Sequence, residues 1–261
     1  MTSSEYFAEE QPRQHGKKVY GALVSIAMVA LVCWVGALQW KDRSAVASIT
    51  VKGERIIPVD EVIRLANIQR NTGMYNIDLT TVGQNIRQNY FVKNVIVQRD
   101  APSTIHIEIE ERTPIALVSL QGKNDLLYLD DEGYILPHVA TKAIFDVPVI
   151  TGVDSLVTVG QRTTQRDLWG ALDVLHAARD VSDEIFHMIS EIRIHDGHDI
   201  VLYSSDTGVP IIFGRGDAVK KMVKLDAFWK KFIEGEGTQN IQYIDLRFDD
   251  QVIVANKKQS S

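Results

Sequence analysis

One uncharged stretch near the N-terminus constrains the fold of this chain more than any other feature. Residues 19–38 are twenty consecutive residues without a charge or a proline. At roughly 1.5 Å rise per residue, a helix of that length covers the roughly 30 Å hydrocarbon core of a bilayer. The backbone must be helical there, because each unpaired amide in lipid is costly. We therefore predict a membrane-spanning helix over residues 19–40, with Tyr20, Trp34 and Trp40 near its ends.

A cleaved signal peptide is the alternative interpretation, since Ala45-Val46-Ala47 offers a small-residue cleavage site. The apolar run exceeds the roughly 7–15 residues usual for a signal peptide, which favours an uncleaved anchor. Lysine and arginine flank both ends of the run, so charge alone only weakly favours a cytoplasmic N-terminus. A tail of 18 residues is too short to fold. We therefore expect this tail in the cytoplasm and the folded mass on the other side of the membrane.

The composition excludes several classes of function. The chain has 261 residues and a formal net charge of −6. Its first 18 residues are neutral overall, so the net negative charge lies in the residues after the apolar run. An acidic folded region argues against nucleic acid, whose phosphates require a basic face. Cys33 is the only cysteine and lies within the apolar run. We therefore expect neither a disulfide nor a thiol nucleophile in the folded region.

The first part of the folded region has the pattern of two helices and three strands. A short β-type run ends at Lys52-Gly53, and a helical pattern begins at Pro58. Asp78 is a suitable cap for a second helix, over residues 79–90. Apolar and polar side chains alternate over residues 92–99 and 104–110. This pattern predicts two strands of a sheet that has one face exposed to solvent. The predicted order over residues 45–114 is β-α-α-β-β.

The pattern of residues 115–256 predicts a strand-rich unit with two helices. The predicted fold class of the folded region is therefore α+β. The helices are expected at residues 164–179 and, after Asp217 as a cap, up to residue 233. The last two strands are expected at residues 241–248 and 251–255, followed by a polar tail at 257–261. The other strands are expected at residues 115–120, 126–129, 134–136, within 185–195, at 200–203 and at 209–213.

Several local patterns together resemble the FtsQ/DivIB family of bacterial cell-division proteins. The family has a short tail, one anchor, a POTRA domain and a β domain, so the resemblance covers nearly the whole chain. No segment is specific alone, but their order behind one anchor is. The segments are Val51-Lys52-Gly53, Val95-Ile96-Val97-Gln98-Arg99, Pro102, Thr104-Ile105-His106-Ile107, Glu111-Arg112-Thr113-Pro114-Ile115-Ala116, Asp130-Asp131-Glu132-Gly133, Pro148-Val149-Ile150-Thr151-Gly152 and Ile244-Asp245-Leu246-Arg247.

The resemblance implies a non-enzymatic scaffold of the divisome in the inner membrane, enriched at the septum. In the family, the coiled-coil protein FtsB adds to the edge of the β domain near its last strands, and FtsL is a further partner. Carried over, the binding residues are Arg247 and Phe248, with Val252, Ile253 and Val254 behind them. Phe248 stands where the family usually has tyrosine, so any contact through a phenolic hydroxyl is lost.

Other interpretations of the motifs are weaker. His195-Asp196-Gly197-His198-Asp199 holds metal-ligand residue types, but Asp-Gly suits a hairpin turn and the remaining ligands of a zinc site are missing. No nucleophile stands beside a base in a known catalytic pattern. We expect no metal, cofactor or small-molecule substrate. A membrane-anchored cell-envelope enzyme and a POTRA-bearing export component remain the alternative classes.

Overall fold

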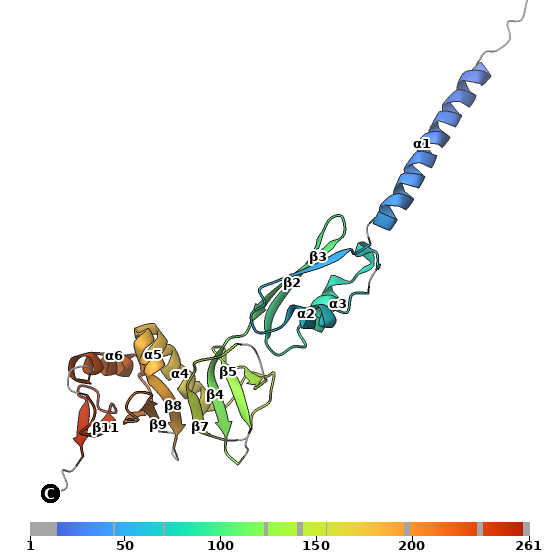
Figure 1. Cartoon of the computed structure of the whole chain (residues 1–261). Coiled ribbons are helices and arrows are strands. Elements are labelled where there is room, and N and C mark those ends of the chain that lie inside the picture. The colour runs from blue at the N-terminus through green and yellow to red at the C-terminus, as the bar shows by residue number, and fades with distance from the viewer. Residues whose placement is uncertain are drawn as a thin grey trace, which may run out of the picture.

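The computed structural model describes residues 15–43, 45–69, 71–122, 125–139, 143–154, 156–195, 199–233 and 237–257. Its strands form two sheets, one of three strands and one of nine. Figure 1 shows helix α1 apart from both sheets and the smaller sheet between α1 and the larger one. We call β1–β3 with α2 and α3 the small unit, and β4–β12 with α4–α6 the large unit. The α+β fold class is confirmed.

Helix α1 spans His15–Arg43 and contains the uncharged stretch. Its described large apolar side chains are exposed, including Leu31 at 61% and Trp34 at 68%. Within the residues that the structure describes, no helix meets the length and hydropathy needed to cross a membrane. The membrane span over residues 19–40 therefore stays a prediction from the sequence, and most of the tail before it lies outside the described residues.

The small unit has the predicted β-α-α-β-β order, with its strands arranged β1-β3-β2. β1 (Ser48–Lys52) runs parallel to β3 (Thr104–Glu111), which pairs antiparallel with β2 (Val92–Asp100). The isoleucines of β3 are buried because their period-two spacing turns them all to the helix-covered face. The helices on that face are α2 (Val59–Ala66) and α3 (Leu79–Ile86), and the short turn η1 (Met74–Asn76) connects them.

Two carboxylates order the loops of the small unit. Asp78 caps α3 as predicted, accepting a hydrogen bond of 2.9 Å from the Thr80 amide. α3 ends at Ile86, so it is shorter than the predicted 79–90. Glu111 is only 5% exposed and accepts hydrogen bonds from three consecutive backbone amides, those of Arg55, Ile56 and Ile57. This one side chain therefore fixes the turn between β1 and α2.

The large unit is a mixed sheet in the order β12-β11-β10-β9-β8-β7-β4-β5-β6. The strand at residues 149–153 was not predicted, because its short run has no alternation to mark it. The strands are β4 (Pro114–Leu120), β5 (Leu126–Asp130), β6 (Ile135–Pro137), β7 (Val149–Val153), β8 (Ile189–Ile194), β9 (Ile200–Ser204), β10 (Pro210–Gly214), β11 (Ile241–Asp245) and β12 (Ile253–Asn256).

The prediction of two helices in the large unit is wrong, because the described part of this unit has three. α4 spans Arg166–Val181, and the short helix α5 (Asp183–Met188), which the sequence did not predict, follows it. α6 spans Ala218–Phe228 and continues as the π-helical turn η2 (Trp229–Ile233). Asp217 occupies the N-cap position of α6, as predicted, but it has φ +48° and its side chain makes no capping hydrogen bond.

The two units share a hydrophobic cluster and an ion-pair network. Tyr128 and Leu136 of the large unit are buried in the same cluster as Phe91 of the small unit. Arg112, which connects β3 to β4, donates from Nη1 to Asp130 Oδ2 at 2.6 Å, and its guanidinium lies 3.5 Å from the centre of the Tyr134 ring. The units therefore pack directly on each other across this short connection.

Candidate partner-binding edge

Arg247 and Phe248 lie in the connection between β11 and β12, not on the strand where the sequence predicted them. β11 ends at Asp245, and the Leu246 amide still donates to Ile212 O of β10 at 2.9 Å. The Arg247 amide then donates to Asp245 Oδ1 at 3.0 Å instead of to a neighbouring strand. A side-chain hydrogen bond of this kind competes with the ladder, which explains why the strand ends there.

The three predicted residues at β12 divide between the two faces of the sheet. β12 runs antiparallel to β11, with Val254 opposite the buried Ile244 and Ile253 opposite Asp245. Val252 and Val254 are half-buried and pack against the main core of the large unit. Ile253 therefore lies on the opposite face. The structure brings all five predicted residues to one edge of the sheet but not to one surface patch.

Arg247 has a partner within the chain. Its Nη2 donates to Asp245 Oδ2 at 2.7 Å and its Nε to Oδ1 at 3.1 Å. Burial by itself would raise the pKa of Asp245, but the hydrogen bonds from the side chain and amide of Arg247 hold this pKa below its usual value. The Asp245 side chain is 6% exposed and that of Arg247 is 47% exposed. The arginine is thus fixed at its inner side and open to solvent at its outer side.

Two neighbouring loops surround the Arg247 side chain. A Cβ atom at Gly214, where φ is +69°, would lie 2.8 Å from Arg247 Cγ, so the stem of the arginine crosses directly over this glycine. Asp199 Oδ2 lies 4.0 Å from Arg247 Nη1, and Asp199 Oδ1 lies 4.0 Å from Arg215 Nε. Sequence reasoning missed Gly214 and Asp199, since only the fold brings these three loops to one end of the sheet.

β12 is an edge strand, and its outward backbone groups follow from one hydrogen bond. The Lys257 amide donates to Asn240 O at 2.8 Å, so it faces the β11 side. Because successive amides of an extended strand point to opposite sides, the amides of Val254 and Asn256 face the outer edge. No other strand in the described part of the chain pairs with that edge. It therefore offers unpaired donors and acceptors.

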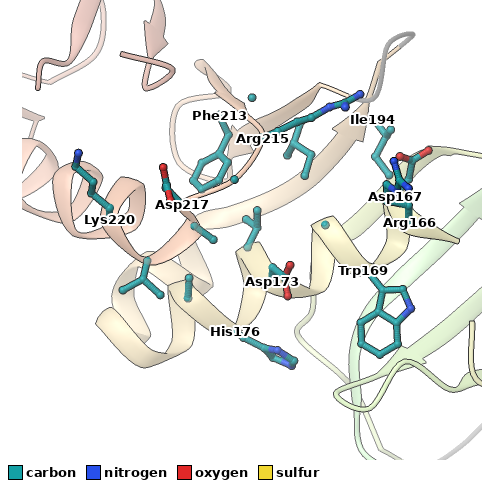
Figure 2. Close-up of a pocket in the computed structure, with 18 of the residues that line it drawn as sticks. Arg166, Asp167, Trp169, Asp173, His176, Ile194, Phe213, Arg215, Asp217 and Lys220 are labelled. Atoms are coloured by element: carbon teal, nitrogen blue, oxygen red, sulfur yellow. The ribbon is translucent and has the colours of Figure 1, made fainter. Parts of the chain in front are cut away.

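A separate cleft of about 930 Å³ lies between α4 and α6 (Figure 2). Its lining includes Phe213, Asp173 of α4 and Lys220 of α6, but none of the five predicted residues. Figure 2 shows Trp169 and His176 pointing away from Phe213, so they do not converge on a bound group there.

Metal ligands do not gather anywhere in the part of the chain that the structure describes. No group of three or more histidine, cysteine, aspartate or glutamate side chains is placed to hold an ion there. Residues 196–198, which include the second histidine of the His-Asp-Gly-His-Asp segment, lie outside the described residues. The absence of a metal site in that segment therefore stays a prediction.

Comparison with known proteins agrees with this architecture. A POTRA domain of the FtsQ type matches residues 44–112, and an FtsQ/DivIB C-terminal related domain matches residues 113–255. The fold thus defines a POTRA-type unit followed by a β domain of this class. The chain belongs to the FtsQ/DivIB family of cell division proteins, which are not enzymes.

Curated relatives resemble the chain over most of its length. The cell division protein FtsQ of Geotalea daltonii is 28% identical over 234 residues, which are 86% of this chain and 83% of the relative. FtsQ of Syntrophotalea carbinolica is 29% identical over 236 residues, 89% of this chain and 82% of the relative. FtsQ of Salinibacter ruber is 27% identical over 250 residues, 94% of this chain and 95% of the relative. The resemblance found in the sequence is therefore confirmed.

Proposed function

We propose that this chain is a bitopic membrane scaffold of the bacterial divisome, which links division proteins and regulates septal peptidoglycan synthesis through protein contacts. Its partner at the β12 edge is an FtsB-like coiled-coil protein, which adds a strand to the sheet, with an FtsL-like protein in the same assembly. The small unit and the large unit lie on the extracytoplasmic side, anchored by residues 19–40. The observation that carries the proposal is the unpaired outer edge of β12 in the described part of the chain.

Strand addition suits this edge for a physical reason. An incoming extended segment satisfies the outward amides of Val254 and Asn256, and backbone hydrogen bonds need no particular partner sequence. Side-chain contacts then supply selectivity, from Ile253 on one face and from Val252 on the other. Within the described residues the edge carries no proline in β12, so none of its donors is missing.

The charge at this end of the sheet favours an acidic group on the partner. Asp245 occupies Nε and Nη2 of Arg247, while Nη1 lies 4.0 Å from the half-exposed Asp199. A partner carboxylate can replace water at that nitrogen. Because Asp245 already fixes the guanidinium, little side-chain entropy is lost on binding. Phe248, which is 45% exposed, adds an apolar contact beside it.

The anchor completes the proposal. The large apolar side chains described in α1 are not covered by any other described part of the chain. The hydrocarbon core of a membrane is the environment in which such side chains are stable. The family relationship supports a membrane protein of the division site.

The test uses the full chain, tagged and expressed in cells, with recovery of the FtsB-like protein of the same genome as the measurement. Phe248→Glu is expected to reduce recovery at least tenfold, since it places a charge in an apolar contact next to an acidic partner. Leu126→Glu is the matched control, because Leu126 is 39% exposed and lies on β5, far along the sheet from β12. Undiminished recovery with Phe248→Glu would overturn the proposed binding edge.

A further inference from the structure

A single lysine holds the connection that carries Arg247 and Phe248. Nζ of Lys224, on α6, lies 2.5 Å from Phe248 O and 3.3 Å from Asp249 O, with Leu246 O at 3.5 Å. An ammonium group has three donors and no acceptor, so three backbone carbonyls can use its full capacity. Hydrogen bonds to a charged donor are stronger than those between neutral groups.

The placement of Lys224 on α6 makes this possible. Met222 and Leu225 face the core and are fully buried, so the backbone of the helix is fixed against the sheet. Lys224 is half-buried, and its ammonium reaches the connection across the end of β11. Lys221, one turn earlier, is buried and donates to Phe213 O at 3.0 Å and to Arg215 O. Two lysines of one helix thus bind the two loops that meet at Arg247.

We propose that Lys224 is a positioning residue for partner binding, which holds the residue 246–249 connection in the shape that presents Arg247 and Phe248 at the β12 edge. This inference rests on the proposed function, because it concerns the same edge. Lys224 itself does not contact the partner. It acts by keeping the carbonyls of the connection turned toward α6, which leaves the two side chains directed outward before the partner arrives.

A purely structural role for Lys224 makes a different prediction. If the lysine only stabilised the fold, its removal would lower the melting temperature and binding would follow the loss of folded protein. If it positions the connection, binding falls while the core of the protein remains folded, and the amides of residues 247–250 exchange faster with solvent. The two roles are therefore separated by measuring folding, local exchange and binding on the same variants.

The matched variants come from one helix, α6. Lys224→Met keeps the alkyl stem and removes all donors, whereas Lys224→Arg keeps a charged donor that can still reach carbonyls. Lys220→Gln is the control, because Lys220 lies one turn away and approaches the Asp249 side chain, at 3.8 Å, instead of the carbonyls of the connection. Each variant is measured in the full chain for melting temperature, amide exchange at 247–250 and recovery of the FtsB-like protein.

We expect Lys224→Met to lower recovery at least tenfold and to speed exchange at 247–250, while Lys224→Arg restores most of the binding and Lys220→Gln changes neither. Wild-type recovery with Lys224→Met, alongside loss with Phe248→Glu, overturns this inference and leaves the proposed function standing. Wild-type recovery with both variants overturns the proposed function as well. If Lys224→Met does not fold, Lys224→Gln takes its place, and normal recovery with slow exchange in that variant overturns the inference.

Discussion

Tyr90 of the small unit lies directly against Gly160 of the large unit. A Cβ atom at Gly160 would lie 2.4 Å from Tyr90 Cε1, and the glycine has φ +81°. The Gly160 amide also donates to Ile135 O of β6 at 2.7 Å, so the backbone at this point is held by the sheet. The contact is one of the points at which the two units fix each other, together with Arg112 and the shared cluster around Tyr128.

Gly160→Ala is expected to destabilise the protein by about 2–4 kcal/mol, because it adds both a positive-φ penalty and a clash with the Tyr90 ring. Chemical denaturation of the full chain measures the change. Gly208→Ala is the control, since Gly208 also has a positive φ of +63°, but a Cβ atom added there would meet no described atom within 4 Å. An equal loss in both variants would show that the Tyr90 contact contributes nothing.

Glu111→Ala is expected to lower the free energy of unfolding by about 3 kcal/mol. The reason is that the buried amide of Ile57 and two neighbouring amides lose the acceptor that the Glu111 side chain provides. The free energy of unfolding from urea titration checks this. Glu110→Ala is the matched control, because Glu110 is the preceding residue of β3 and its side chain is 58% exposed. A loss below about 1 kcal/mol at Glu111 would mean that solvent replaces the carboxylate.

Stability is expected to fall on acidification partly through Glu132. The hydrogen bond from Lys93, and then that from Arg112, hold the pKa of Glu132 below its usual value. A lowered folded-state pKa stabilises the fold above the unfolded-state pKa, about 4.3, and this contribution is lost as the pH falls through the lower folded-state pKa. The wild type should therefore lose more stability below about pH 4 than the Glu132→Gln variant does.

Much of the small unit could be predicted from the sequence, because its signals are local. The alternation of Ile105, Ile107 and Ile109 and the cap at Asp78 each act within a few residues, and both are confirmed. The end of β11 could not be predicted, since the pattern of apolar residues continues while the Asp245 side chain captures the Arg247 amide. The contacts of Lys224 also could not be predicted. The sequence does not distinguish a helix-surface lysine that faces water from one that donates to three backbone carbonyls.

The structure changes the expected effect of charge reversal at Arg247. From the sequence, Arg247→Glu should weaken partner binding without lowering the melting temperature. The structure pairs Arg247 with the nearly buried Asp245, so Arg247→Glu places two carboxylates together and leaves Asp245 without its counter-charge. We expect a loss of stability of about 1–3 kcal/mol, measured by urea titration. Arg193→Glu is the control, because Arg193 pairs with the less buried Glu191 two residues earlier, at 2.9 Å.

Proline substitution at the edge strand separates the two sides of β12. The Asn256 amide faces the outer edge, so Asn256→Pro removes a donor available to an added strand without breaking a bond to β11. Lys257→Pro instead removes the amide that donates to Asn240 O, a bond of 2.8 Å within the sheet. Proline is tolerated in edge strands where its missing amide would have faced solvent.

We expect Asn256→Pro to lower recovery of the FtsB-like protein several-fold with little change in melting temperature, and Lys257→Pro to lower the melting temperature. The reason is that strand addition uses the outer donors of β12, whereas the pairing with β11 uses the inner ones. Recovery and thermal unfolding of the same two variants are the measurements. If Asn256→Pro binds like the wild type while Phe248→Glu does not, the partner contacts the side chains near β12 and does not extend the sheet.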